Sequence, residues 1–213
     1  VSFPAKDLAR SAEDNERILN NIFGLDTDGY YLFFGALEPK KNVSRLIDAY
    51  AASGVRAPLV IAGGLGWNYK DDVERIEDER HSSWRIANAR ITRERQVRRL
   101  DHVPFTHLIA LIKGARAVLF PSLYEGFGLP VLEAMALGAP VMTSNVSSLP
   151  EVAGEAALCV DPYDIDDMAQ AIRSLDADAD LRAELSRRGL SQAERFSPEI
   201  YRSRVQDVYR KVL

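Results

Sequence analysis

Cysteine and histidine are scarce in this sequence. The 213 residues contain one cysteine, Cys159, and three histidines. A single cysteine cannot form a disulfide within the chain, and the histidines lack the spacing of metal ligands. We therefore expect no disulfide framework and no bound metal. Because the start of the chain also lacks the pattern of a signal peptide, we expect a reducing, cytoplasmic setting.

An excess of positive charge and a long apolar run are absent too. The chain has 27 Lys+Arg against 31 Asp+Glu, a formal charge of -4, which argues against nucleic acid as the main partner. Its longest apolar stretch, 129–142, is interrupted by Pro130, Glu133, Gly138 and Pro140, so no transmembrane segment is expected. At 46% hydrophobic residues the chain can still build a full core, and disorder is excluded.

Short β-branched or aromatic runs alternate with amphipathic stretches. The predicted strands are 30–37, 58–62, 97–103, 117–121, 141–144 and 157–160. These runs are apolar almost throughout, which is typical of parallel strands covered by helices on both faces. We therefore expect an α/β fold with a doubly wound, Rossmann-like, six-stranded parallel sheet. The third run is unusual, because Arg98 and Arg99 lie where a buried strand should be apolar.

The two ends of the chain lie outside this predicted sheet. Residues 1–29 are predicted to be a linker with an edge helix, residues 30–195 the sheet domain, and residues 196–213 a separate C-terminal helix. Ser197 is a good N-cap and Pro198 suits the first helical position. The apolar positions that follow on one face are Tyr201, Val205, Val208, Tyr209 and Val212. No place to dock this helix is evident within a six-unit sheet.

Ligands of doubly wound sheets bind beyond the carboxyl ends of the strands. The loop after the first predicted strand reads GALEPKKN, from Gly35 to Asn42, and puts Lys40 and Lys41 directly before a helix. Cations at that position suit a diphosphate. Taken alone, the same residues are better explained as a solvated basic turn.

Small residues fill two further loops at the same predicted edge. Residues 63–66 read GGLG, which permits a ligand to approach the backbone or simply forms a tight turn. This is no dinucleotide fingerprint, because Tyr69 stands where the third glycine belongs. Residues 145–151 read NVSSLPE and supply small polar groups either for a ligand or for helix capping.

The richest stretch is PSLYEGFGLPVLE, residues 121–133. Pro130 suits a first helical position, so the amides of residues 126–129 would point out of a helix N-terminus and hold an anion. Glu125 and Glu133 flank these amides. A carboxylate beside a phosphate is unfavourable unless it accepts hydrogen bonds from groups such as sugar hydroxyls. The stretch thus indicates a ligand with phosphate and polyol parts, although the helix dipole alone also favours Glu133.

These residues resemble the retaining GT-B glycosyltransferases of the group 1 type, specifically their C-terminal, nucleotide-sugar-binding domain. The similarity covers about residues 30–210. It is carried by the E-x7-E pair within PSLYEGFGLPVLEAMALGAPVMTSNVSSLPEVAG and by AALCVDPYDIDDMAQAI at 156–172. The resemblance implies transfer of a hexose from a nucleotide diphosphate sugar to an acceptor, with retention at the anomeric carbon, no obligatory metal and no cofactor.

The resemblance also implies roles for individual residues. Glu125 and Lys41 would be catalytic, Glu125 touching the donor sugar and Lys41 its diphosphate, while Glu133 would accept from the ribose hydroxyls. The other donor-binding positions would be Gly35, Lys40, Gly126, Phe127, Gly128 and Leu129, with His102 and Val103 facing the base. Two positions depart from the family pattern. Ala36 stands where the family often has Arg, and Asp101 follows Leu100 where the family usually has Gly.

The segment GALEPKKN is most similar to bacterial polysaccharide mannosyltransferases, which implies GDP-mannose as donor and a glycan or lipid-linked acceptor. The acceptor would bind an N-terminal domain absent from these 213 residues, and the last helix would cross back to it. The chain alone would then bind donor without transferring it, in a protein peripheral to the inner face of the membrane. A UDP-sugar donor and a non-catalytic nucleotide-binding module remain the alternatives.

Overall fold

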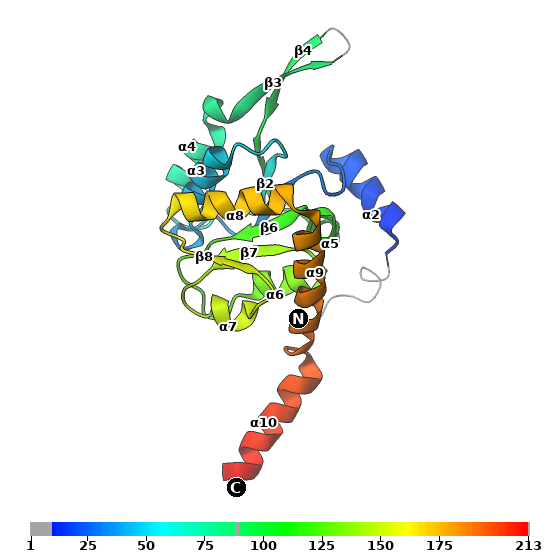
Figure 1. Ribbon diagram of the computed structural model, residues 1–213, viewed down its shortest axis with the longest axis vertical. Helices are drawn as coiled ribbons and strands as arrows, with labels where there is room; N and C mark the ends of the chain where they lie inside the picture. The colour runs from blue at the N-terminus through cyan, green and yellow to red at the C-terminus, as the bar shows by residue number, and fades with distance from the viewer. Residues whose placement is uncertain (1–9, 88–89, 213) are drawn as a thin grey trace.

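The computed structural model describes residues 10–87 and 90–212. Its centre is a parallel sheet of six strands in the spatial order β5-β2-β1-β6-β7-β8 (Figure 1). These are β1 (Tyr31–Phe34), β2 (Leu59–Ala62), β5 (Val97–Leu100), β6 (Ala117–Phe120), β7 (Val141–Ser144) and β8 (Leu158–Val160). Every predicted strand is confirmed, and their order is that of a doubly wound, Rossmann-like sheet.

Two predicted strands were too long at their carboxyl ends. β1 ends at Phe34 rather than at residue 37, because Gly35 takes a φ of 139° and the chain turns across the sheet edge. β5 ends at Leu100 rather than at residue 103, because residues 101–104 lead directly into a helix. β5 also lies at the sheet edge and pairs with β2 on one side. This edge position explains why Arg98 and Arg99 are tolerated in the strand.

Helices cover the sheet in two groups. The α-helices are α2 (Ala12–Ile18), α3 (Val43–Ser53), α4 (Lys70–Glu77), α5 (Phe105–Gly114), α6 (Leu129–Ala136), α7 (Leu149–Ala153), α8 (Ile165–Ala177), α9 (Ala179–Glu194) and α10 (Pro198–Val212). Short turns are η1 (Leu19–Phe23), η2 (Pro39–Lys41) and η3 (Glu79–His81). α3 packs on α4 and α8, whereas α6 packs on α7 and α9, and α5 packs on α2.

The core confirms the expectation of a sheet covered on both faces. Every residue of β1, β2, β6 and β7 is buried. Phe33 and Phe120, on the neighbouring strands β1 and β6, stack with their ring centroids 5.7 Å apart. Full burial of such a side chain stabilises the fold by about 1.5–3 kcal/mol. The paired strands therefore hold the loops that follow them in fixed positions.

An antiparallel hairpin, which the sequence analysis did not predict, rises from the domain between α4 and β5. It consists of β3 (Ser82–Ala87) and β4 (Arg90–Arg95) and forms a sheet of its own. In Figure 1 it projects from one end of the molecule, while α10 projects from the other.

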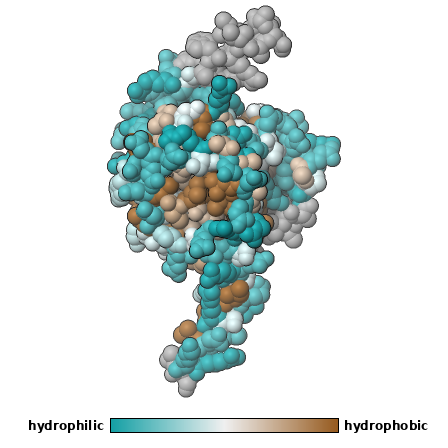
Figure 2. All heavy atoms as spheres, viewed as in Figure 1, coloured by the Kyte–Doolittle hydropathy of each residue, from teal (hydrophilic) through white to brown (hydrophobic). Residues whose placement is uncertain are grey.

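The C-terminal helix begins at Pro198, as predicted. Several of its apolar residues are exposed, Tyr201 by 70% and Val208 by 61%, and Figure 2 shows hydrophobic patches along it. The ends of the predicted segments 1–29 and 196–213, residues 1–9 and 213, lie outside the described residues. Among the described helices, none combines the length and the apolar character that a bilayer span requires.

Candidate functional site

Lys41 and Glu125 meet at the carboxyl edge of the sheet. Lys41 closes the short turn η2 after β1, and Glu125 lies in the loop after the neighbouring strand β6. The Lys41 Nζ donates to Glu125 Oε1 at 2.5 Å. The predicted phosphate lysine and the predicted sugar carboxylate are thus brought into one ion pair.

This ion pair is largely withdrawn from water. Each side chain is 11% exposed, and Lys41 Nζ also lies 4.8 Å from the centroid of the Phe120 ring. Taking a lone charge into such a place is unfavourable, so the ion pair offsets the cost of burying each charge. A ligand that separates them has to replace both partners, an anion for Lys41 and hydrogen-bond donors for Glu125.

Asn42 holds the Lys41 turn in place. Its backbone is left-handed, with a φ of 61°, and ends η2. Its side-chain amide donates to the carbonyls of Pro121, at 3.1 Å, and Pro162, at 2.7 Å. One buried side chain therefore joins the loops after β1, β6 and β8. Asparagine before a helix is a recognisable signal, but no role for Asn42 was predicted.

Two serines fix the backbone around Glu125. The Ser147 hydroxyl accepts from the Glu125 amide at 3.2 Å and donates to the Glu125 carbonyl at 2.7 Å. The Ser148 hydroxyl donates to the carbonyls of Glu125 and Phe127, both at 2.9 Å. The loop after β7 was expected either to meet a ligand or to cap a helix. Both serine side chains instead hold the loop that carries Glu125.

The amides after Glu125 point out of the start of α6. In the part of the chain that the structure describes, the backbone N–H groups of Gly126, Phe127 and Gly128 have no hydrogen-bond acceptor. Gly128 takes a φ of 104°, a conformation that a side chain would make strained. α6 begins at Leu129, one residue earlier than predicted, with Pro130 in its first turn. These donors and the helix dipole favour an anion here.

Glu133 lies one turn into α6 and is half-buried. Burial raises the pKa of its carboxyl group above the usual 4.5. Among the described residues no ion pair joins Glu133 to a cation, so the structure does not group it with Lys41. A carboxylate in this setting is stabilised by hydroxyl or amide donors from a ligand.

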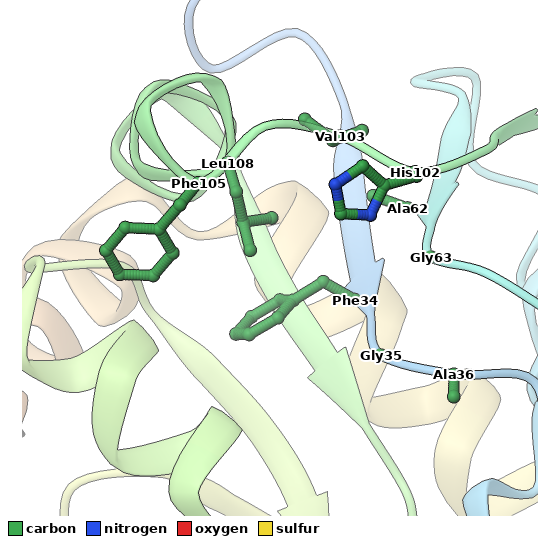
Figure 3. A pocket seen from close by; sticks show the side chains of 9 residues that line it. All are labelled: Phe34, Gly35, Ala36, Ala62, Gly63, His102, Val103, Phe105 and Leu108. Carbon is green, nitrogen blue, oxygen red and sulfur yellow. The ribbon is translucent and has the colours of Figure 1, made fainter.

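Three more predicted residues, Gly35, His102 and Val103, line a pocket of about 310 Å³ beside the first two strands (Figure 3). Its walls are Phe34, Gly35, Ala36, Ala62, Gly63, His102, Val103, Phe105 and Leu108. Figure 3 shows the loop of His102 and Val103 opposite the loop of Gly35 and Ala36. The structure therefore brings Gly35 together with the two positions expected to face a base.

Gly63 and Lys40, two positions considered for ligand binding, make contacts within the protein instead. A Cβ on Gly63 would stand 2.0 Å from the Gly35 carbonyl oxygen, so this glycine is needed for the loops after β1 and β2 to pass each other. Lys40 turns to Glu38, with 3.3 Å between Nζ and the carboxylate, and 44% of its side chain is exposed. Lys40 therefore does not share the Glu125 contact with Lys41.

The side chains of Phe127 and Leu129 face a different hollow. They line a groove of about 540 Å³ with Phe196 and Tyr201, and Phe127 meets Phe196 edge-on at 5.7 Å. The backbone of these residues lies at the start of α6, while their side chains lie at the base of α10. Within residues 10–87 and 90–212 no cluster of His, Cys, Asp and Glu could hold a metal ion.

Comparison with known families gives one match. A sequence profile described as "Glycosyl transferases group 1" matches residues 15–192. Among characterised proteins, the O-antigen chain mannosyltransferase B of Escherichia coli is 42% identical over 181 residues. The serotype-specific mannosyltransferase WbdA of the same species is 34% identical over 174 residues. The alignments cover 83% and 80% of this chain but 44% and 20% of those proteins, so the chain spans less than half of either.

Solved structures share the fold. The sucrose-phosphate synthase of Thermosynechococcus elongatus is 25% identical, with a TM-score of 0.73 over 96% of this chain and 50% of its own. HepE of Anabaena, solved in complex with UDP and glucose, is 19% identical, with a TM-score of 0.78 over 99% of this chain and 55% of its own. This chain corresponds to about one half of each.

Proposed function

The chain belongs to the group 1 glycosyl transferases, and from this we propose that it is the donor-binding half of a mannosyltransferase that uses GDP-mannose. The family membership rests on the profile match, and the fold on the six-stranded sheet and its GT-B neighbours. The similarity to two mannosyltransferases supports mannose as the sugar. The donor, the stereochemistry and the residue roles below are our proposal.

The observation that carries the proposal is the Lys41–Glu125 pair beside unpaired amides. When the donor binds, its diphosphate takes the Lys41 ammonium group and the amides of Gly126, Phe127 and Gly128. Glu125 then accepts from the sugar hydroxyls instead of from Lys41. In the structure each charge is neutralised by the other.

The reaction replaces one bond at the anomeric carbon by another on the same face. The bond from that carbon to the diphosphate oxygen breaks, a bond to the acceptor hydroxyl oxygen forms, and the hydroxyl proton passes to the departing diphosphate. Negative charge develops on the departing diphosphate, where Lys41 and the start of α6 are positioned to stabilise it. These groups supply the positive charge at the leaving group, so we propose that transfer requires no metal ion.

The nucleoside of the donor binds at other positions along the carboxyl edge of the sheet. Glu133 accepts from the ribose hydroxyls, and the base enters the pocket between Gly35 and the His102–Val103 loop (Figure 3). The acceptor, a glycan or a lipid-linked glycan, binds a domain outside these 213 residues. The exposed apolar face of α10 contacts that domain, and the protein works in the cytoplasm.

Calorimetric titration of the chain with GDP, GDP-mannose, UDP and UDP-glucose in EDTA tests the proposal. We expect guanine nucleotides to bind, with weaker binding after Glu133→Ala. Glu155→Ala removes an exposed carboxylate at the turn before β8 and serves as the matched control.

Each outcome has a distinct meaning. Preference for uridine nucleotides would replace the proposed donor and keep the proposed site. Equal losses in the Glu133→Ala and Glu155→Ala variants would remove Glu133 from the site. Failure of all four ligands to bind, both here and in the longer protein that contains this chain, would overturn the proposed function.

A further inference from the structure

Asp72 is a buried carboxylate that the proposed donor site does not use. Among the described side chains, the two most buried charged residues are Lys41, 9% exposed, and Asp72, 5% exposed. Lys41 has Glu125 as its partner, whereas no ion pair within the described part of the chain joins Asp72 to a cation. A carboxylate taken out of water in this way needs hydrogen-bond donors, because its charge is otherwise costly.

The donors that Asp72 meets come from the first turn of α3. The Ser44 hydroxyl donates to Asp72 Oδ1 at 2.5 Å. Burial raises the pKa of the Asp72 carboxyl group, while donation from the hydroxyl and the backbone N–H of Ser44 lowers it. Asp72 itself lies in the first turn of α4, so one carboxylate joins the starts of two helices. Both helix dipoles favour a negative charge at that position.

α3 receives no cap from the residue that precedes it. Asn42 stands at the cap position with a left-handed backbone, and its side chain makes no capping hydrogen bond. Its amide nitrogen donates to the carbonyls of Pro121 and Pro162, and its amide oxygen accepts from Arg45. The first backbone N–H groups of a helix need an acceptor from outside the helix. Asp72 therefore supplies from α4 the cap that Asn42 does not supply.

This cap lies directly behind the Lys41 turn. Lys41 ends η2, and α3 begins two residues later at Val43. α4 follows the loop of Gly63, which lines the pocket proposed for the base. α3 and α4 pack on each other (Figure 1). The bond from Ser44 to Asp72 thus fixes the loop that carries the proposed phosphate lysine relative to the loop that forms a wall of the pocket.

We propose that Asp72 is a positioning residue, which caps α3 and thereby holds the Lys41 ammonium group where the donor diphosphate binds. This role rests on the proposed donor function and adds to it a residue that acts through Ser44 rather than on the donor. A merely structural link between α3 and α4 would change stability alone. A positioning role also changes the contribution of Lys41 to nucleotide affinity.

Calorimetric titration with GDP, or with UDP if the chain prefers it, tests the role in binding. Asp72→Ala should weaken binding by about fivefold, the size of effect that loss of a cap has on its helix. Asp72→Asn keeps an oxygen acceptor for Ser44 and should stay within about twofold of the unsubstituted chain. Asp71→Ala is the matched control, since Asp71 is the exposed carboxylate beside it, and should leave the affinity unchanged. In a Lys41→Met background, Asp72→Ala should change the affinity by less than about twofold.

Hydrogen exchange gives a readout that needs no nucleotide. The backbone N–H groups of residues 43–46 should exchange about fivefold faster in Asp72→Ala, and at the original rate in Asp72→Asn and Asp71→Ala. The amides of α6 should keep their exchange rate in all three variants, which separates a local effect from general destabilisation. Ser44→Ala breaks the same bond from the other helix and should reproduce the result if Asp72→Ala does not fold.

The two experiments can overturn the proposal separately. Unchanged exchange at the start of α3, or equal effects of Asp72→Ala and Asp72→Asn, would exclude the cap. Faster exchange with unchanged nucleotide affinity, or an undiminished loss in the Lys41→Met background, would exclude the positioning of Lys41. If the unsubstituted chain and the longer protein bind no nucleotide, the donor function fails together with the positioning role. The exchange experiment still decides in that case whether Asp72 caps α3.

Discussion

The two edges of the sheet handle charge in different ways. At the amino edge, Arg116 bonds to Asp176 and to the Asp28 carbonyl at 2.9 Å, while Arg182 reaches the Asp28 carboxylate at 3.2 Å. The Tyr31 hydroxyl donates to Asp176 at 2.9 Å. Two cations and two anions thus satisfy one another within the described chain. At the carboxyl edge, one pair, Lys41 with Glu125, lies beside amides without acceptors.

The difference separates stability from binding. The amino-edge network joins the segment before β1, the start of β6 and the helices α8 and α9, so its partners are all parts of the fold. The carboxyl edge leaves donors open and places the Lys41–Glu125 ion pair where a ligand can exchange partners. Substitutions at the amino edge should therefore change stability, and those at the carboxyl edge should mainly change binding and transfer.

The largest expected effect is on transfer, through Lys41. We expect Lys41→Met in the longer protein to lower kcat by about 10²–10³-fold, because the leaving diphosphate loses its cation. Glu125 also loses its partner, so unfolding becomes easier. Adding Glu125→Gln should restore the stability without restoring transfer, as seen in denaturant unfolding and single-turnover assays.

Lys40→Met is the matched control, since Lys40 is 44% exposed and pairs with Glu38. It should lower kcat by less than about tenfold. Comparable losses of kcat in Lys41→Met and Lys40→Met would contradict the proposal that Lys41 in particular stabilises the leaving diphosphate.

A second prediction tests whether a carboxyl-edge residue can also be structural. A Cβ at Gly63 would collide with the Gly35 carbonyl, so Gly63→Ala should destabilise the fold by roughly 2–3 kcal/mol and weaken nucleotide binding in the neighbouring pocket. Gly64 has open space around its missing Cβ, and Gly64→Ala should leave both properties nearly unchanged. Thermal unfolding and nucleotide titration measure the two effects. If the two variants have similar stability and nucleotide affinity, the glycine cluster is an ordinary flexible turn.

The amino edge should show the reverse pattern. Asp176→Ala removes the acceptor of the buried Tyr31 hydroxyl and a partner of Arg116, which should lower the free energy of unfolding by roughly 1–2 kcal/mol. Nucleotide affinity should stay within about twofold. Asp207→Ala breaks an exposed pair with Arg210 on α10 and should cost at most about 0.5 kcal/mol. A loss of nucleotide affinity in the Asp176→Ala variant would mean that the two edges are coupled.

The sequence predicted the carboxyl edge better than the amino edge for a physical reason. Buried parallel strands have apolar runs that are visible locally, and the topology then brings the loops of Lys41 and Glu125 together. The amino-edge pairs depend on contacts across long separations, such as Tyr31 with Asp176, 145 positions apart. The Ser147 contact with Glu125 has the same origin. The hairpin was missed because residues 74–101 are crowded with charge and no apolar run marks its two strands.

The smallest expected effect concerns Glu133 and pH. Burial raises the pKa of this carboxyl above 4.5, so its ionised form destabilises the fold above the folded-state pKa, and this cost fades as the pH falls toward 4.5. Glu133→Gln should therefore stabilise the chain near neutral pH by less than about 1 kcal/mol, and the gain should vanish below pH about 4.5.

Binding of GDP-mannose, whose diphosphate is esterified at both ends, should reverse this preference. If ribose hydroxyls donate to Glu133, they lower its pKa, so affinity rises with pH through the raised value and binding releases protons. Calorimetry in buffers of different ionisation enthalpy measures that release. The Glu133→Gln variant should show none, because it keeps a hydrogen-bond acceptor but has no proton to lose. If the unsubstituted chain and the Glu133→Gln variant release equal numbers of protons, the titrating group is not Glu133. The carboxyl edge would then contain another ionisable group that responds to the donor, besides the Lys41–Glu125 pair.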